Sequence, residues 1–107
     1  MLLAFSSTIS ADMRDFCRDK WPDDYRMQEH CMEKQTEAKR KFYDLAERCH
    51  LMKNNKFKVS STGSDFERIF IHCMEKWELD EFDTYDFRMT VYCIEKQLES
   101  YRRLQKY

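Results

Sequence analysis

The sequence predicts an all-α protein, because it is poor in turn residues, its apolar residues recur at helical spacing, and a cysteine-containing motif is repeated along it. The 107 residues include one Gly and one Pro, and strand-rich folds need turn residues far more often. Charged residues make up 36% of the chain, and the abundant Glu, Lys, Arg, Met and Leu favour helices. The length corresponds to a single domain.

The repeated motif is C-x-[DE]-K-[WQ], which alternates between a Trp form and a Gln form. Its four copies begin at Cys17, Cys31, Cys73 and Cys93. The sequence around them is repeated too, since residues 24–27 (DYRM) correspond to residues 86–89 (DFRM). The same order of residue types in both halves predicts a tandem duplication of a helical hairpin that carries one cysteine on each arm.

Two hairpins give four helices. We expect them at residues 12–20, 23–53, 64–78 and 84–105. Pro22 is preorganised for the first turn of the second helix, and Ser64 with Glu67 forms a capping box at the third. Asp83 or Thr84 can cap the fourth helix.

One face of each long helix is spaced for packing against a core. On the second helix this seam of inward-facing residues comprises Cys31, Gln35, Ala38, Phe42, Leu45, Cys49 and Met52. The fourth helix is expected to repeat it through Cys93, Gln97, Ser100 and Leu104. We therefore expect Gln35 and Gln97 to be at least half buried, where each amide needs hydrogen-bond partners.

The domain organisation follows from the repeat. Residues 12–107 are expected to form one helical domain, with hairpin copy one at 12–53, a loop at 54–63 and hairpin copy two at 64–107. Residues 1–11 hold a short apolar stretch, small polar residues and a terminal Ala, an order that resembles the end of a secretory signal peptide. We expect a signal-peptide remnant there, and a flexible tail is the alternative.

Four of the five cysteines are expected to form two disulfides. Cys17 and Cys31 lie on antiparallel arms at heights that differ by only about 5 Å. Cys73 and Cys93 have the same relation in the second copy, so each bridge would join the arms of its own hairpin. Cys49 has no counterpart in the duplication and is expected to be a free thiol. Cross-copy pairs remain open, as does a fully reduced core.

Charge and motifs argue against several classes of function. The formal net charge of −1 creates no field that attracts nucleic acid, and no apolar run is long enough to span a membrane. No nucleotide-binding or nucleophile motif occurs. Carboxylates such as Glu33 and Glu37 alternate with Lys34 and Lys41, which is typical of ordinary surface pairs on a helix. We therefore expect neither an enzyme nor a cofactor.

Each histidine is adjacent to a cysteine in the sequence, at His30, His50 and His72. Cysteine and histidine are the usual zinc ligands, so a Cys/His metal-binding carrier is one alternative function. The spacing argues against it, because neighbouring residues on a helix point about 100° apart and no C-x2-C pair is present.

Aromatic and basic residues at matched positions of the two copies are candidates for a binding patch. They are Trp21, Tyr25, Arg26, Trp77, Phe87 and Arg88. The aromatic–Arg pairs open the two long helices, so they are expected to form a paired recognition patch at one end of the bundle. The simpler interpretation is a helix cap followed by a core aromatic. The two tryptophans are expected to close the hairpins over the disulfides, and an exposed Trp there would be a binding hot spot.

The doubled pattern C-x3-W…D-[YF]-x-M-x3-C-x3-Q resembles small uncharacterised exported bacterial proteins with cysteine-bearing helical hairpins. In the first copy it is carried by Cys17, Trp21, Asp24, Met27, Cys31, Gln35 and Ala38. In the second copy it is carried by Cys73, Trp77, Asp86, Met89, Cys93 and Gln97, with Ser100 in place of the alanine. The resemblance covers about residues 12–105, and it implies an exported location and no catalytic residues.

Together these observations predict a non-enzymatic, disulfide-stabilised protein-binding module that is exported to the periplasm or secreted. A small inhibitor, an immunity protein or an envelope-stress protein would have these properties. Its partner is expected to be another protein or an envelope component, and the module itself a monomer or weak dimer. The alternative is a cytosolic phage or bacterial inhibitor or adaptor whose cysteines are reduced.

Overall fold

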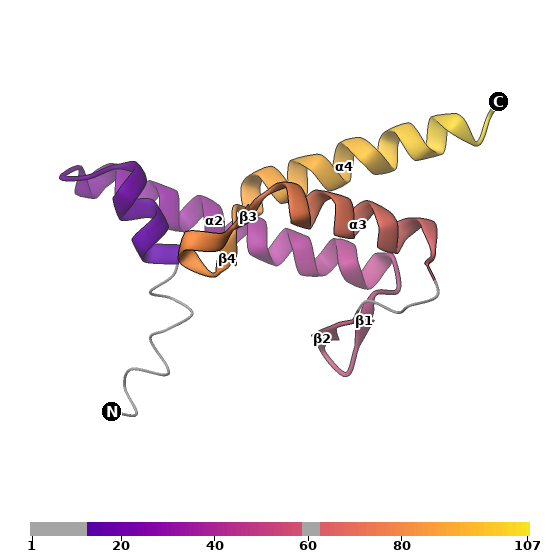
Figure 1. The fold of residues 1–107 in the computed structure, drawn as a ribbon, viewed down its shortest axis with the longest axis horizontal. Helices are drawn as coiled ribbons and strands as arrows, with labels where there is room; N and C mark the ends of the chain where they lie inside the picture. Colours follow the sequence, from indigo (N-terminus) through magenta and orange to yellow (C-terminus); the bar gives the residue numbers. More distant parts are fainter. Residues whose placement is uncertain (1–12, 59–62) are drawn as a thin grey trace.

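The computed structural model describes residues 13–58 and 63–107 (Figure 1). The predicted signal-peptide remnant lies outside these residues. A helical segment over residues 13–20 is followed by α2 (Tyr25–Arg48), α3 (Asp65–Lys76) and α4 (Phe87–Leu104). The predicted all-α class and the four helices are therefore confirmed.

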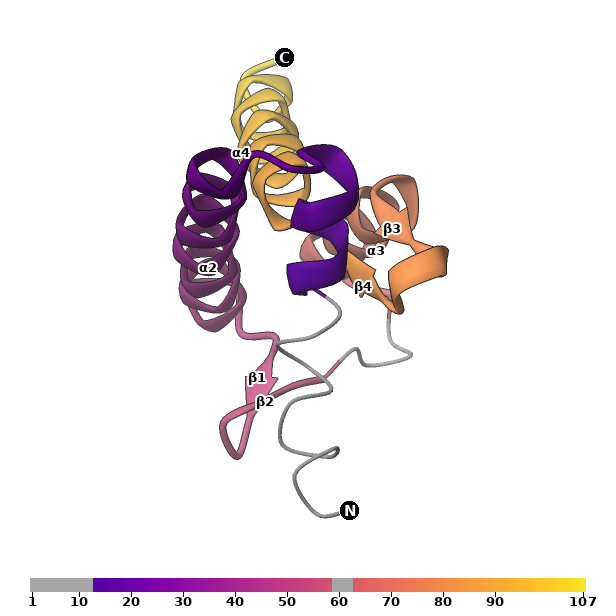
Figure 2. The ribbon, with the colours of Figure 1, turned by 90° about the vertical axis from the view of Figure 1, so that its left-hand side faces the viewer.

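The four helices form two hairpins that are displaced along a common axis. The 13–20 segment folds back on the first half of α2, and α3 folds back on α4 (Figure 1). Both α2 and α3 pack against α4, which lies between them when the molecule is viewed along its length (Figure 2). Because α4 begins beside the middle of α2, the molecule is elongated, with extents of 51 × 29 × 21 Å.

Both disulfides expected from the sequence are confirmed. Cys17 bonds to Cys31 and Cys73 bonds to Cys93, with Cα atoms 5.7 and 5.6 Å apart. Each bridge joins the two arms of its own hairpin, and no bridge links the two copies. Cys49 is the free cysteine, and its side chain is half-buried.

The connection between the copies differs from the predicted loop at 54–63. Strand β1 (Met52–Lys53) pairs in antiparallel fashion with β2 (Lys56–Phe57). The turn residues Asn54 and Asn55 both have positive φ, which gives a two-residue turn that suits the strand twist. Helix α2 consequently ends at Arg48 and not at residue 53, and His50 after it also has a positive φ.

A second small hairpin joins α3 to α4. Strand β3 (Glu78–Leu79) pairs with β4 (Thr84–Tyr85) across a 3-10 turn at Asp80–Phe82. The start predicted for the fourth helix at residue 84 is therefore too early, because Thr84 belongs to a strand. Asp86 caps α4 by accepting a hydrogen bond from the Met89 amide.

The core is centred on an aromatic cluster that joins elements of both copies. The Phe42 ring of α2 lies 5.3 Å from the Phe57 ring, 5.5 Å from Phe70 and 5.8 Å from Phe87. Aromatic pairs at these spacings are favourable beyond the area that they bury. The cluster therefore holds α2, α3, α4 and the β1–β2 hairpin together.

The predicted seam on the fourth helix is wrong. Gln97, Ser100 and Leu104 are exposed, and Cys93 is only half-buried. The apolar residues that α4 buries are instead Phe87, Val91, Ile94 and Leu98. These residues also repeat at steps of four and three. Helix α4 therefore carries two stripes of residues at helical spacing, the predicted one that begins at Cys93 and the buried one that begins at Phe87. Packing between α2 and α3 selects the fully apolar one.

The two bridges are expected to dominate the stability of this small domain. Closing loops of these lengths stabilises the native state by about 3 kcal/mol each on the chain-entropy model. We expect the double variants C17S/C31S and C73S/C93S each to lower the free energy of unfolding by about that amount in denaturant titrations. The oxidised chain should weigh about 4 Da less than the reduced chain, since each bridge removes two hydrogens.

The matched control is Cys49→Ser, which removes a thiol without removing a bridge. It should change the free energy of unfolding by less than about 1 kcal/mol. Equal stability of the oxidised and reduced chains would contradict the expectation.

Candidate functional site at the junction of the copies

A buried glutamine joins the two copies. Gln35 on α2 is only 2% exposed, and its amide bonds to the first residues of α4. Its Nε2 donates to Asp86 Oδ1 at 2.9 Å, and its Oε1 accepts from the Phe87 backbone amide at 2.9 Å. The expectation that Gln35 is buried and partnered is therefore confirmed.

The hydrogen bonds of Gln35 and Asp86 supply acceptors to backbone amides at the start of α4. The first amides of a helix have no partners within it, so a buried end requires acceptors from elsewhere. Asp86 provides one acceptor to the Met89 amide, and Gln35 provides another to Phe87. We call Gln35, Asp86 and Phe87 the amide latch. It fixes α4 at one position along α2.

Gln97, the counterpart of Gln35 in the second copy, is exposed. The expectation that it is at least half buried is therefore wrong. The physical reason is the stagger of the two copies. The region of α2 that contains Gln35 receives the start of α4, but among residues 13–58 and 63–107 no further helix begins beside Gln97.

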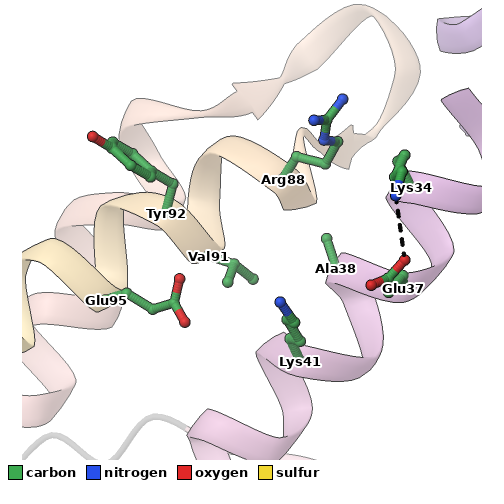
Figure 3. Close-up of a pocket in the computed structure, with 8 residues that line it drawn as sticks. All are labelled: Lys34, Glu37, Ala38, Lys41, Arg88, Val91, Tyr92 and Glu95. Atoms are coloured by element: carbon green, nitrogen blue, oxygen red, sulfur yellow. Dashed lines mark ion pairs between the residues drawn. The ribbon is translucent and has the colours of Figure 1, made fainter.

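A groove runs alongside the latch between α2 and α4 (Figure 3). It is lined by Lys34, Glu37, Ala38, Lys41, Arg88, Val91, Tyr92 and Glu95. Ala38 and Val91 face each other across its floor, and the Lys41 and Glu95 side chains extend toward the space between the helices (Figure 3). Lys34 and Glu37 form an ion pair at 3.9 Å. The groove therefore combines a small apolar floor with charges of both signs.

The groove continues past the start of α4 toward the first helix. Arg88 and Tyr92 also line a second hollow, together with Lys20, Gln35 and Asp86. Tyr92 is 57% exposed, and the Lys96 ammonium lies 5.6 Å from the centre of its ring. Tyrosine and arginine are enriched among residues that dominate binding energy at interfaces. Tyr92 and Arg88 stand where the two hollows meet.

The residues predicted for a binding patch do not form one surface. Tyr25 is 78% exposed at the start of α2, where Arg26 and Trp21 are exposed beside it. The Phe87 assignment is wrong, because that side chain is 7% exposed and packs against Phe42.

The stagger explains why the matched segments are separate. Helix α4 begins beside Gln35, which follows Asp24 by 11 residues. At 1.5 Å of rise per residue, the two helix starts are therefore about 16 Å apart along α2. The expected paired patch at one end of the bundle is not formed, although Arg88 lines the groove. Trp77 is half-buried at the end of α3.

The groove residues Lys41, Tyr92 and Glu95 were not predicted as site residues from the sequence. Lys41 belongs to a run of alternating charges, which is the usual composition of a solvated helix face. Tyr92 lies off both stripes of α4. The stagger of the copies brings these residues together, and periodicity within one helix does not reveal it.

The cysteine and histidine pairs do not assemble into a cluster. Four cysteines are in disulfides and so present no thiolate to a metal. His30, His50 and His72 are all exposed. Within residues 13–58 and 63–107, no group of three His, Cys, Asp or Glu side chains is placed to hold a metal ion.

The Cys49 thiol lies in an environment that favours its protonated form. Burial raises the pKa of Cys49, and the nearby Arg102 guanidinium acts in the opposite direction but more weakly. Because the thiolate is the nucleophile, a raised pKa lowers the reactivity of this cysteine at neutral pH.

No family model, no curated protein and no solved structure matches the chain. In the described part of the chain, no helix is both long and apolar enough to cross a membrane. The resemblance to exported bacterial proteins stays a prediction.

Removing the Gln35 amide should destabilise the protein, because it leaves the buried Phe87 amide without its acceptor. We expect Gln35→Ala to lower the free energy of unfolding by about 2–3 kcal/mol. The duplication offers a matched control, since Gln97→Ala removes the same side chain from an exposed site. This variant should change the free energy of unfolding by less than about 0.5 kcal/mol. Chemical denaturation of both variants measures the difference. Similar losses for the two variants would rule out the amide latch.

Cys49 should react slowly with a thiol reagent while the protein is folded. At pH 7.5 we expect its alkylation by iodoacetamide to be at least about tenfold slower than that of the chain unfolded in guanidinium without reductant. Arg102→Ala should slow it further, because the arginine lowers the thiol pKa. Intact mass measured over time follows the reaction. Faster alkylation of the Arg102 variant would contradict the assigned electrostatic effect.

Proposed function

We propose that this protein is a non-enzymatic binding module that works outside the cytoplasm and recognises another protein, or a protein component of the envelope, through the groove between α2 and α4. The observation that carries the proposal is the groove itself, whose two walls come from different copies and are held in place by the amide latch.

The composition of the groove supports recognition of a polypeptide. Lys41 and Arg88 offer donors to carboxylates and carbonyls, while Glu95 accepts hydrogen bonds. Tyr92 adds an exposed aromatic surface at the rim. Interfaces whose binding energy is concentrated in a few Tyr and Arg side chains surrounded by polar groups are common among protein complexes.

The covalent framework supports a location in an oxidising compartment. The two disulfides fit a small disulfide-stabilised extracellular module. They also limit the freedom of both hairpins before a partner binds. Binding to a preorganised surface costs less conformational entropy than binding that must first order a flexible one.

Photocrosslinking at the groove tests the binding function. A benzophenone amino acid at position 92 should form a covalent adduct with a protein in an envelope extract of the source organism, and the same group at Tyr107 should not. Arg88→Ala combined with the position 92 probe should reduce the adduct at least about tenfold, as removal of a hot-spot residue does. Identical adducts from positions 92 and 107 would overturn the groove as the binding site.

Thiol trapping in cells of the source organism tests the compartment. Acid quenching of the cells, followed by alkylation of the endogenous protein in denaturant without reductant, should label one thiol, that of Cys49, because the other four cysteines are oxidised in an exported protein. Labelling of five thiols would instead establish the cytosolic alternative with reduced cysteines.

A further inference from the structure

The contact between the two copies is made by two different faces of equivalent helices. Helices α2 and α4 align without a gap at a constant offset of 62 residues, so that Asp24 corresponds to Asp86 and Gln35 to Gln97. Copy one uses Gln35 and Phe42 of α2 at this contact, whereas copy two uses the start of α4. Contacts of this kind are heterologous, and each copy is left with one unused face.

Both unused faces are exposed. The tail face is the part of α4 that corresponds to the contact surface of α2, and it comprises Gln97, Ser100 and Leu104. The head face is the start of α2, which corresponds to the start of α4, and it comprises Asp24, Tyr25 and Glu29. Leu104 is 65% exposed and Tyr25 is 78% exposed, where their counterparts Phe42 and Phe87 are buried against each other.

The chemistry of the amide latch is retained on these faces. Asp24 caps α2 by accepting a hydrogen bond from the Met27 amide, as Asp86 does for Met89 in α4. Gln97 presents the same amide that Gln35 uses to bind the start of α4. The donor and acceptor groups of a second latch are therefore present in each chain, at opposite ends of the repeat.

The charges of the groove are retained as well. Every charged groove residue has a counterpart of the same sign: Lys34 and Lys96, Glu37 and Glu99, Lys41 and Arg103, Arg88 and Arg26, Glu95 and Glu33. The counterparts of the α2 wall lie in the same stretch of α4 as the tail face, and those of the α4 wall lie in the first part of α2 with the head face. Placed together in the same way, they would reproduce the charge pattern of the internal groove.

We propose that the occupant of the tail face is the head face of a second copy of this chain, bound as copy two is bound to copy one. Gln97 of one chain then binds Asp24 and the Tyr25 amide of the next, and Tyr25 packs against Leu104. The association is head-to-tail, so it adds chains without a fixed end. This proposal does not depend on the proposed function.

Two substitutions make the contact between chains weaker than the contact inside the chain. Glu29 stands in the place of Val91, and Leu104 replaces the larger Phe42, so less apolar surface is buried. Glu29 and Arg103 are the counterparts of Val91 and Lys41, which line the same groove, and their opposite charges compensate part of that loss. Association is therefore expected at high protein concentration.

Sedimentation equilibrium of the oxidised full chain with end-blocked variants tests the proposal. The average mass of the unmodified protein should rise from 13.3 kDa to at least twice that value between about 10 μM and about 1 mM. Tyr25→Asp blocks the head, and Leu104→Glu blocks the tail. Each variant alone should remain at the mass of one chain over this range.

The decisive sample is an equimolar mixture of the two variants. Each supplies the end that the other lacks, so the mixture should form a dimer and nothing larger. Glu75→Ala, an exposed change on α3, serves as the control and should associate like the unmodified protein. Circular dichroism verifies that each variant is folded. An intact mass about 4 Da below that of the reduced chain, which corresponds to the loss of four hydrogens, verifies that both bridges are formed.

Three results would overturn the proposal. One is a single-chain mass for the unmodified protein at about 1 mM, and another is a mixture that remains monomeric. The third is a dimer that both variants leave intact, because it would indicate a symmetric interface elsewhere on the surface.

Discussion

The arrangement of this protein depends on the requirement that the amides at a buried helix start find acceptors. Helix α4 begins inside the molecule, and its first amides bond to Asp86 and to Gln35 of the preceding copy. Since an unsatisfied amide there would cost on the order of 1–3 kcal/mol, α4 is held at one position along α2. The stagger of the copies, the stripe of α4 that is buried and the groove beside the latch all follow from that position.

The disulfides stabilise the individual hairpins, whereas the amide latch stabilises the contact between them. The bridges act within each hairpin, where they restrict the unfolded chain. The latch and the aromatic cluster around Phe42 act between the hairpins, which no disulfide joins in the described part of the chain. Local structure is therefore secured covalently, while the relation between the copies depends on hydrogen bonds and packing.

The sequence contained enough information to predict the hairpins, their bridges and the free Cys49, because each is a local property of a duplicated motif. The buried stripe of α4 was not predictable in the same way. Both stripes of that helix have helical spacing, and the cysteine at position 93 favours the wrong one. The choice is made by Gln35 and Phe42, which precede Phe87 of α4 by 52 and 45 residues. The groove residues Lys41 and Tyr92 were not predicted for the same reason.

The order of the cysteines along the chain has a consequence for biogenesis. Each bridge joins cysteines that are consecutive in the sequence within their own hairpin, and Cys49 falls between the two pairs. Because a chain is made from its N-terminus, Cys17 and Cys31 can pair before Cys49 is available. Cys49 is then the one thiol that can capture Cys73 wrongly while Cys93 is still to come. In the finished fold Cys49 is half-buried at the end of α2 and its thiol pKa is raised, which slows its exchange with the completed Cys73–Cys93 bridge.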